Sequence, residues 1–352
     1  MNFTETLEKL LKEKAKENYD NSLSWPKLCA SLLALEPNRT TPFGEITRHL
    51  YDCINSCLLN LNNDDHNVTQ AHSRFEKGLL ERPFYLALAE MLETCIFKNL
   101  GEFPESLKTS KLFMLENKNL SRLDEIEEEM KHLYNNVFIN ATYPLNDEKE
   151  RQFSKFLFEF LTPKDLNTFL GLRTTVGSAP QLPPSLQECL ESFTKIYVKK
   201  SAKPKLNRSK AASFSANTLT VGAKAHSKHF HRDVSDAFWG TCTGTEKQKN
   251  EQANRVLAKI ITNAAWINLH SLPHDTRVYE VRNEQGYGAR WEIYDPIIKQ
   301  ANANPNNIDS DDENDNKTLQ ISHNIDKGHA SIIFRGFLEP QMLDGHAKGW
   351  VH

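Results

Sequence analysis

The first 198 residues carry apolar side chains at spacings of three and four, which is the pattern of amphipathic helices. Pro83 precedes one apolar run and Gly101 follows it, while Thr162 and Asp165 flank Pro163 in a capping-box pattern. Alternating runs of β-branched residues are nearly absent. We therefore predict an all-α N-terminal domain over residues 1–198, with helices at 84–100, 126–138, 166–172 and 185–198.

The pattern changes in the last third of the chain. Thr245 and Gln248 form a capping-box pattern before a helix with one apolar face, whose last apolar residue is Ala264. Strands are predicted at 277–283, 287–294 and 330–338, the first two joined as a hairpin through residues 284–286. These elements predict a small α+β domain over 221–352, a long helix packed on an antiparallel sheet. The fold class is α+β overall.

Two polar stretches interrupt the predicted series of helices and strands. Residues 199–220 are basic, rich in Ser and Ala, and without an acidic residue, so we interpret them as a linker between the domains. Residues 302–317 are acidic and rich in Asn, and we interpret them as a flexible insertion within the second domain.

Composition places the chain among globular proteins, with 39% apolar and 25% charged residues. No apolar run approaches the roughly 18 residues of a membrane span, and the first residues lack the apolar centre of a secretory signal. The six cysteines show no CxxC spacing, which favours free thiols. We expect no membrane partner and an intracellular location, cytoplasmic first, with the nucleus left open.

Charge is distributed unevenly. Residues 1–198 hold 22 basic and 29 acidic side chains, whereas residues 199–259 hold 13 basic and 4 acidic ones. A basic stretch of this kind, followed by aromatic and arginine side chains, suits recognition of a polyanion, although it also fits a solvated tether.

The segment at 222–233 concentrates imidazoles. His229 and His231 would share one face of a strand, whereas His226 and His229 would share one face of a helix. His229 and His231 are therefore candidate ligands of a divalent metal, and Arg232 is a candidate anion contact. The alternative is that these histidines pack, cap a helix or bind anions.

The predicted hairpin and its flanks supply the other candidate binding residues. Arg282 and Arg290 fall on the polar face of the hairpin, where they could bind a phosphate or pair with glutamates. The long helix is predicted to continue toward Pro273, which would place Trp266 and His270 on one of its faces. The candidate anion-binding set is His229, His231, Arg232, Arg282, Arg290 and Arg335, with Trp266 and Trp291 as stacking surfaces or core residues.

The end of the chain is dense in acidic and imidazole groups. Glu339 or Asp344 with His346 could form a general acid and base pair, because both residue types are tunable toward neutral pH. The candidate catalytic set is His270, His346, Glu339 and Asp344. Exposed polar surface is the competing interpretation.

These motifs also resemble a known module. GAKAHSKHFHR, WINLHSLPH, YEVRNEQGYGARW and FRGFLEPQMLDGHAKGW are similar to the C-terminal module of a family of uncharacterised proteins, over about residues 222–352. The resemblance implies that this region is a real domain, and it names no ligand.

Three hypotheses follow for function. The first is binding of a phosphate-bearing ligand or nucleic acid by the C-terminal domain. The second is a hydrolase, metal-dependent or acid/base, that uses the C-terminal His, Asp and Glu residues. The third is a helical module that binds a protein partner.

Overall fold

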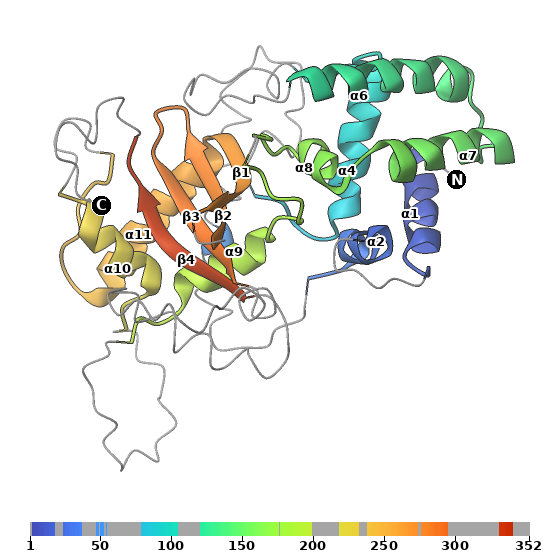
Figure 1. Ribbon diagram of the computed structural model, residues 1–352. Helices are drawn as coiled ribbons and strands as arrows, with labels where there is room; N and C mark the ends of the chain where they lie inside the picture. Colours follow the sequence, from blue (N-terminus) through green and yellow to red (C-terminus); the bar gives the residue numbers. More distant parts are fainter. Residues whose placement is uncertain are drawn as a thin grey trace, which may run out of the picture.

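The structure is a computed structural model that describes residues 2–17, 24–36, 47–48, 50–52, 54, 79–104, 120–175, 177–198, 218–231, 238–273, 276–294 and 331–340. A helical part and a part built around one sheet lie side by side (Figure 1). The fold is α+β, as predicted. The predicted domain boundaries at 198 and 221 and the insertion at 302–317 stay predictions, and most of the linker and the insertion lie outside the described residues.

The helical part contains α1 (Phe3–Lys14), α2 (Trp25–Leu33), α4 (Phe84–Glu93), α6 (Leu120–Leu133), α7 (Asp147–Lys155) and α8 (Pro163–Phe169). Single π-helical turns extend three of them: η2 (Thr94–Lys98), η4 (Tyr134–Phe138) and η5 (Phe156–Phe160). Thr162 and Asp165 form the predicted capping box at α8. Gly101, with φ of 95°, ends the η2 turn in the left-handed region that glycine tolerates.

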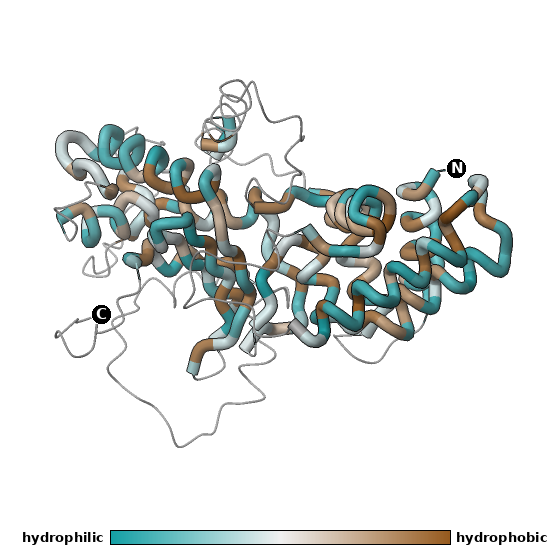
Figure 2. Tube along the Cα trace, turned by 90° about the horizontal axis from the view of Figure 1, so that it is seen from above, coloured by the Kyte–Doolittle hydropathy of each residue, from teal (hydrophilic) through white to brown (hydrophobic). Residues whose placement is uncertain are grey.

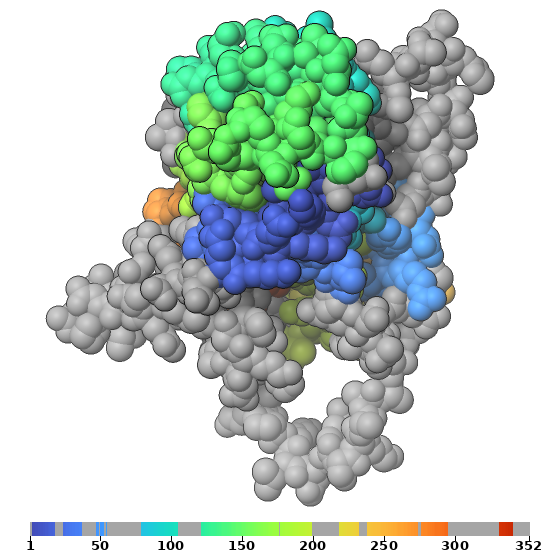
Figure 3. All heavy atoms as spheres, turned by 90° about the vertical axis from the view of Figure 1, so that its right-hand side faces the viewer, coloured from blue at the N-terminus to red at the C-terminus, as the bar shows by residue number. Residues whose placement is uncertain are grey.

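Phenylalanines fill the core of the helical part. Phe3 on α1 contacts Phe97, Phe138 and Phe153 with ring centroids 5.3 to 5.6 Å apart. Apolar and polar positions alternate along the helices of this part (Figure 2), and on α1 the buried residues Phe3, Leu7, Leu10 and Leu11 form an apolar stripe that faces the core. On the face shown in Figure 3, helices α1 and α2 pack directly against residues 120–160.

The second part contains α9 (Leu186–Thr194), α10 (Val221–His229), α11 (Glu246–Thr262) and four strands. These strands are β1 (Ala264–Leu272), β2 (Thr276–Asn283), β3 (Gly288–Tyr294) and β4 (Ser331–Leu338), antiparallel in the order β1-β2-β3-β4. The predicted strands and the hairpin between β2 and β3 are confirmed. The capping box at Thr245 and Gln248 also begins α11 as predicted.

The prediction that the long helix continues toward Pro273 is wrong. It ends at Thr262, with Asn263 as the cap, and the chain turns at once into β1. Ile267 and Leu269 alternate with Asn268 and His270, which is the period of two that a strand requires.

One face of the sheet packs on the helices. Phe193 of α9 contacts Phe334 and Phe337 of β4, at centroid distances of 4.9 and 6.0 Å. Trp291 on β3 donates from Nε1 to the carbonyl oxygen of Cys189 in α9 at 3.1 Å. Helix α9, from the predicted helical domain, thus contributes to the packing of the sheet. No helix in the described part of the chain is long and apolar enough to span a membrane.

Candidate functional site

The strands place polar side chains together on the sheet face opposite this core. Glu280 on β2 lies opposite Asn268 on β1 and Arg290 on β3, and Val278 lies opposite His270. Residues opposite one another in register point to the same face. We call it the polar face, and it comprises Trp266, Asn268, His270, Val278, Glu280, Arg282, Arg290, Glu292 and Arg335.

Glu280 is the centre of the polar face. Its Oε1 accepts from Nε of Arg282 at 2.6 Å, and its Oε2 accepts from Nε of Arg290 at 2.8 Å. Nε2 of His270 lies 3.5 Å from Oε2. The carboxylate is only 2% exposed, so two guanidiniums and an imidazole surround a buried anion.

These contacts keep Glu280 ionised. Burial opposes ionisation of the carboxyl, but the nearby imidazole of His270 and the charges of Arg282 and Arg290 outweigh it and hold the pKa of Glu280 well below its usual range. A carboxylate with so low a pKa is a weak base. It therefore acts as an anchor for its cationic partners.

Three cationic or imidazole side chains keep part of their surface open on this face. Exposure is 20% for His270, 26% for Arg290 and 30% for Arg335. Arg335 pairs with the buried Glu292 at 3.0 Å. Nε2 of His270 is buried while the ring remains partly exposed, so the ring turns its other edge outward. Such an arrangement could bind an anion and exchange a proton with it.

A second imidazole and carboxylate pair lies where β4 ends. Nδ1 of His229, at the C-terminus of α10, is 2.6 Å from Oε1 of Glu339. Nη1 of Arg282 donates to the carbonyl oxygen of Glu339 at 2.9 Å. Arg282 therefore joins this pair to Glu280, and residues from three distant motifs meet: the His-rich segment, the hairpin and the chain end.

The two candidate tryptophans are buried. Trp291 is 0% exposed on the core side of the sheet, next to Phe334 at 5.5 Å, so a stacking role would require it to leave the core. Trp266 is on the polar face at 3% exposure, in a T-shaped arrangement with the ring of His270 at a centroid distance of 6.4 Å. Trp291 therefore fills the core of the sheet, whereas Trp266 is buried among the polar-face residues.

Arg232, Asp344 and His346 lie outside the described residues, so their predicted roles stay predictions. His231 follows α10 and is exposed. Within the described part of the chain, no three His, Cys, Asp or Glu side chains are grouped so that they could hold a metal ion. The metal site predicted at His229 and His231 stays a prediction.

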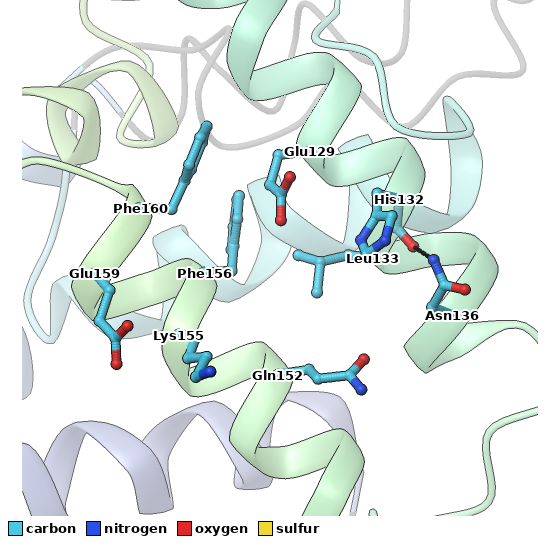
Figure 4. A pocket seen from close by; sticks show the side chains of 9 residues that line it. All are labelled: Glu129, His132, Leu133, Asn136, Gln152, Lys155, Phe156, Glu159 and Phe160. Atoms are coloured by element: carbon cyan, nitrogen blue, oxygen red, sulfur yellow. Dashed lines mark hydrogen bonds between the residues drawn. The ribbon is translucent and has the colours of Figure 1, made fainter.

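A hollow in the helical part lies apart from this site. It measures about 580 Å³, between α6 with η4 and α7 with η5, over a floor that includes Leu133 and Phe156 (Figure 4). His132, Gln152 and Lys155 are on its rim. None of the residues predicted to bind or react is part of it.

Sequence reasoning missed two features of the site. The hairpin glutamates were expected only as ion-pair partners of Arg282 and Arg290, not as the centre of a site. The alternation of apolar and polar residues around Asn268 was the signal that could have placed Asn268 beside Glu280. Residues 173–175 and 177–179, which lie along β1, carry no sequence motif that could have predicted this position.

The comparisons with known proteins concern the same region. Residues 208–297 match a family model described as the CdiA C-terminal tRNase toxin domain. The match covers about a quarter of the chain, from before α10 to just beyond β3, and it overlaps the module predicted from residue 222. No curated protein and no solved structure gives a significant match.

Proposed function

We propose that the C-terminal part of the chain binds RNA and cleaves its phosphodiester backbone on the polar face, with transfer RNA as the substrate class. The proposal rests on the overlap between the matched range and the polar face. The range that matches a domain described as a tRNase toxin holds His270, Glu280 and Arg290, which converge on one face of the sheet.

RNA supplies its own nucleophile for this reaction. The 2′-oxygen attacks the adjacent phosphorus, and the proton of the 2′-hydroxyl passes to a base. The bond from phosphorus to the 5′-oxygen breaks, and that oxygen takes up a proton. The products are a 2′,3′-cyclic phosphate and a 5′-hydroxyl, so the protein must supply only a proton acceptor, a proton donor and cations.

The residues of the polar face suit these tasks. Arg290 and Arg335 would bind the phosphate and stabilise the charge that grows on its oxygens. His270 would accept the proton, with Glu280 as the positioning residue that holds the ring. His346, outside the described residues, is our candidate for the donor to the 5′-oxygen.

The same cleavage assay also tests the metal-dependent alternative. Metal-dependent hydrolysis predicts loss of cleavage with a chelator and recovery with a divalent cation. A protein partner of the helical part stays a prediction, and nothing in the polar face depends on it.

The test is cleavage of transfer RNA by the purified full-length chain. We expect His270→Ala to lower the cleavage rate by about 10²- to 10⁴-fold, the usual contribution of a general base, while RNA binding is kept. His132→Ala, which removes an exposed imidazole from the hollow in the helical part, is the matched control and should leave the rate unchanged.

Binding gives a second readout. Arg335→Gln should reduce the slope of log Kd against log salt by about one, because one phosphate contact is lost. Wild-type protein that neither binds nor cleaves RNA, with or without divalent cations, would contradict the proposed function. Equal rates for wild type and His270→Ala would reject the assigned role of His270.

A further inference from the structure

A segment from outside the matched range borders the polar face at β1. We call residues 173–175 and 177–179 the β1 rim. The backbone N–H of Arg173 donates to Ile267 at 2.7 Å, that of Ala179 donates to Leu269 at 2.8 Å, and the carbonyl of Gly177 accepts from Ser271 at 3.1 Å. Since β1 is an edge strand, these bonds fix the rim along the open side of the sheet.

Side chains tie the rim to the polar face itself. Oγ of Ser178 donates to Oδ1 of Asn268 at 2.8 Å, and Nδ2 of Asn268 donates to Oγ1 of Thr175 at 3.2 Å. Asn268 lies opposite Glu280 in the sheet, and Ser178 forms an isolated bridge with His270. The rim is therefore directly beside the strand residue, His270, whose imidazole the proposed reaction uses.

The rim also carries a cation that has no counter-ion among the described residues. Arg173 is 6% exposed, its Nη1 has no hydrogen-bond partner, and it takes part in no ion pair with the described residues. Burial lowers the pKa of Arg173 to about 10, so the guanidinium is still charged at neutral pH. A buried and uncompensated charge costs stability, which an approaching anion would offset.

Gly177 gives this rim an approachable surface. The residue is exposed, and a Cβ built on it would meet nothing within 4 Å. Backbone this open lets a phosphate come close, and contacts to the phosphate and sugar fix the position of a nucleic acid rather than read its bases.

We propose that the β1 rim is a binding surface for the sugar-phosphate backbone of the RNA strand, where the strand passes from His270 over Gly177. This inference rests on the proposed function and extends the site beyond residues 208–297 into the segment that follows α8. A rim with only a structural role, as a connection between α8 and α9, would be indifferent to charge at position 177.

The experiment places opposite charges at Gly177 in the full chain. Gly177→Glu and Gly177→Lys are compared for binding to transfer RNA over a range of salt, in the His270→Ala background so that the RNA stays intact. We expect the lysine variant to steepen the dependence of log Kd on log salt by about one and the glutamate variant to weaken affinity and flatten it. Arg173→Met should also weaken binding without lowering the thermal unfolding midpoint.

Asn135→Glu and Asn135→Lys, at an exposed position of η4, are the matched controls and should bind as the parent does. Parental salt slopes for both Gly177 variants would overturn the β1 rim proposal, as would equal shifts in one direction, which indicate bulk rather than charge. Failure of the proposed function is recognised separately, because the parent protein itself would then show no salt-dependent binding to RNA.

Discussion

The two faces of the sheet use the same strands and reach similar burial by opposite means. On the core face, Tyr279 and Trp291 are fully buried among phenylalanines of β4 and α9. On the polar face, Glu280 and Glu292 are 2% and 1% exposed, yet both are charged groups paired with arginine.

The two faces contribute differently to the stability of the fold. Apolar burial stabilises the fold roughly in proportion to area, whereas buried ion pairs repay their desolvation only with close geometry and contribute little net stability. The core face therefore accounts for the fold. A costly set of charges on the other face is better explained by function, which the following substitutions separate from stability.

The largest effect is expected from Glu280→Gln. The change leaves Arg282, which is 3% exposed, without its buried counter-charge, and removing one partner of a buried pair costs about 3–5 kcal/mol. Urea unfolding monitored by tryptophan fluorescence measures the loss. The exposed Glu251→Gln on α11 is the control. A loss below that of the control would show that the polar face is held by other contacts.

Trp291→Phe tests the core face. The substitution removes the hydrogen bond to Cys189 and leaves unfilled volume, for an expected loss of about 2 kcal/mol in unfolding free energy. The proposed RNA cleavage, measured per folded molecule, should be kept, because Trp291 does not face the polar face.

Tyr279→Phe is the matched control on the same face. It removes a buried hydroxyl that has no hydrogen-bond partner in the described part of the chain, so stability should stay the same or rise. A Trp291→Phe protein that is fully stable but inactive would reverse the assignment of the two faces.

Lowering the pH over the readily accessible range should reduce the stabilisation that Glu280 provides, by a smaller amount than the substitutions above. Because the folded-state pKa of Glu280 is depressed, its stabilisation is complete above the unfolded value of about 4.3 and is lost as pH falls from there toward the folded-state pKa. Unfolding free energy measured between pH 7 and pH 3 should fall more steeply for wild type than for Glu280→Gln. Parallel curves for the two proteins would show that Glu280 does not titrate in this way.

Local patterns predicted much of the second part of the fold. Strands β2, β3 and β4 followed from alternation, and α11 followed from its apolar face and the capping box at Thr245. Strand β1 was missed because Trp266 and His270, four residues apart, share a face in a strand as well as in a helix. That spacing alone cannot distinguish the two structures.

The sequence by itself determined the α+β class, the hairpin, and the residue types available for phosphate chemistry, because these depend on neighbours within one turn or one strand. Only the tertiary structure decided that Glu280 gathers Arg282, Arg290 and His270, that His229 meets Glu339 across 110 positions, and that Trp291 belongs to the core. It also brought the β1 rim beside His270. Such contacts depend on strand register and on packing between distant segments, and the free energies that select them are summed over the whole fold.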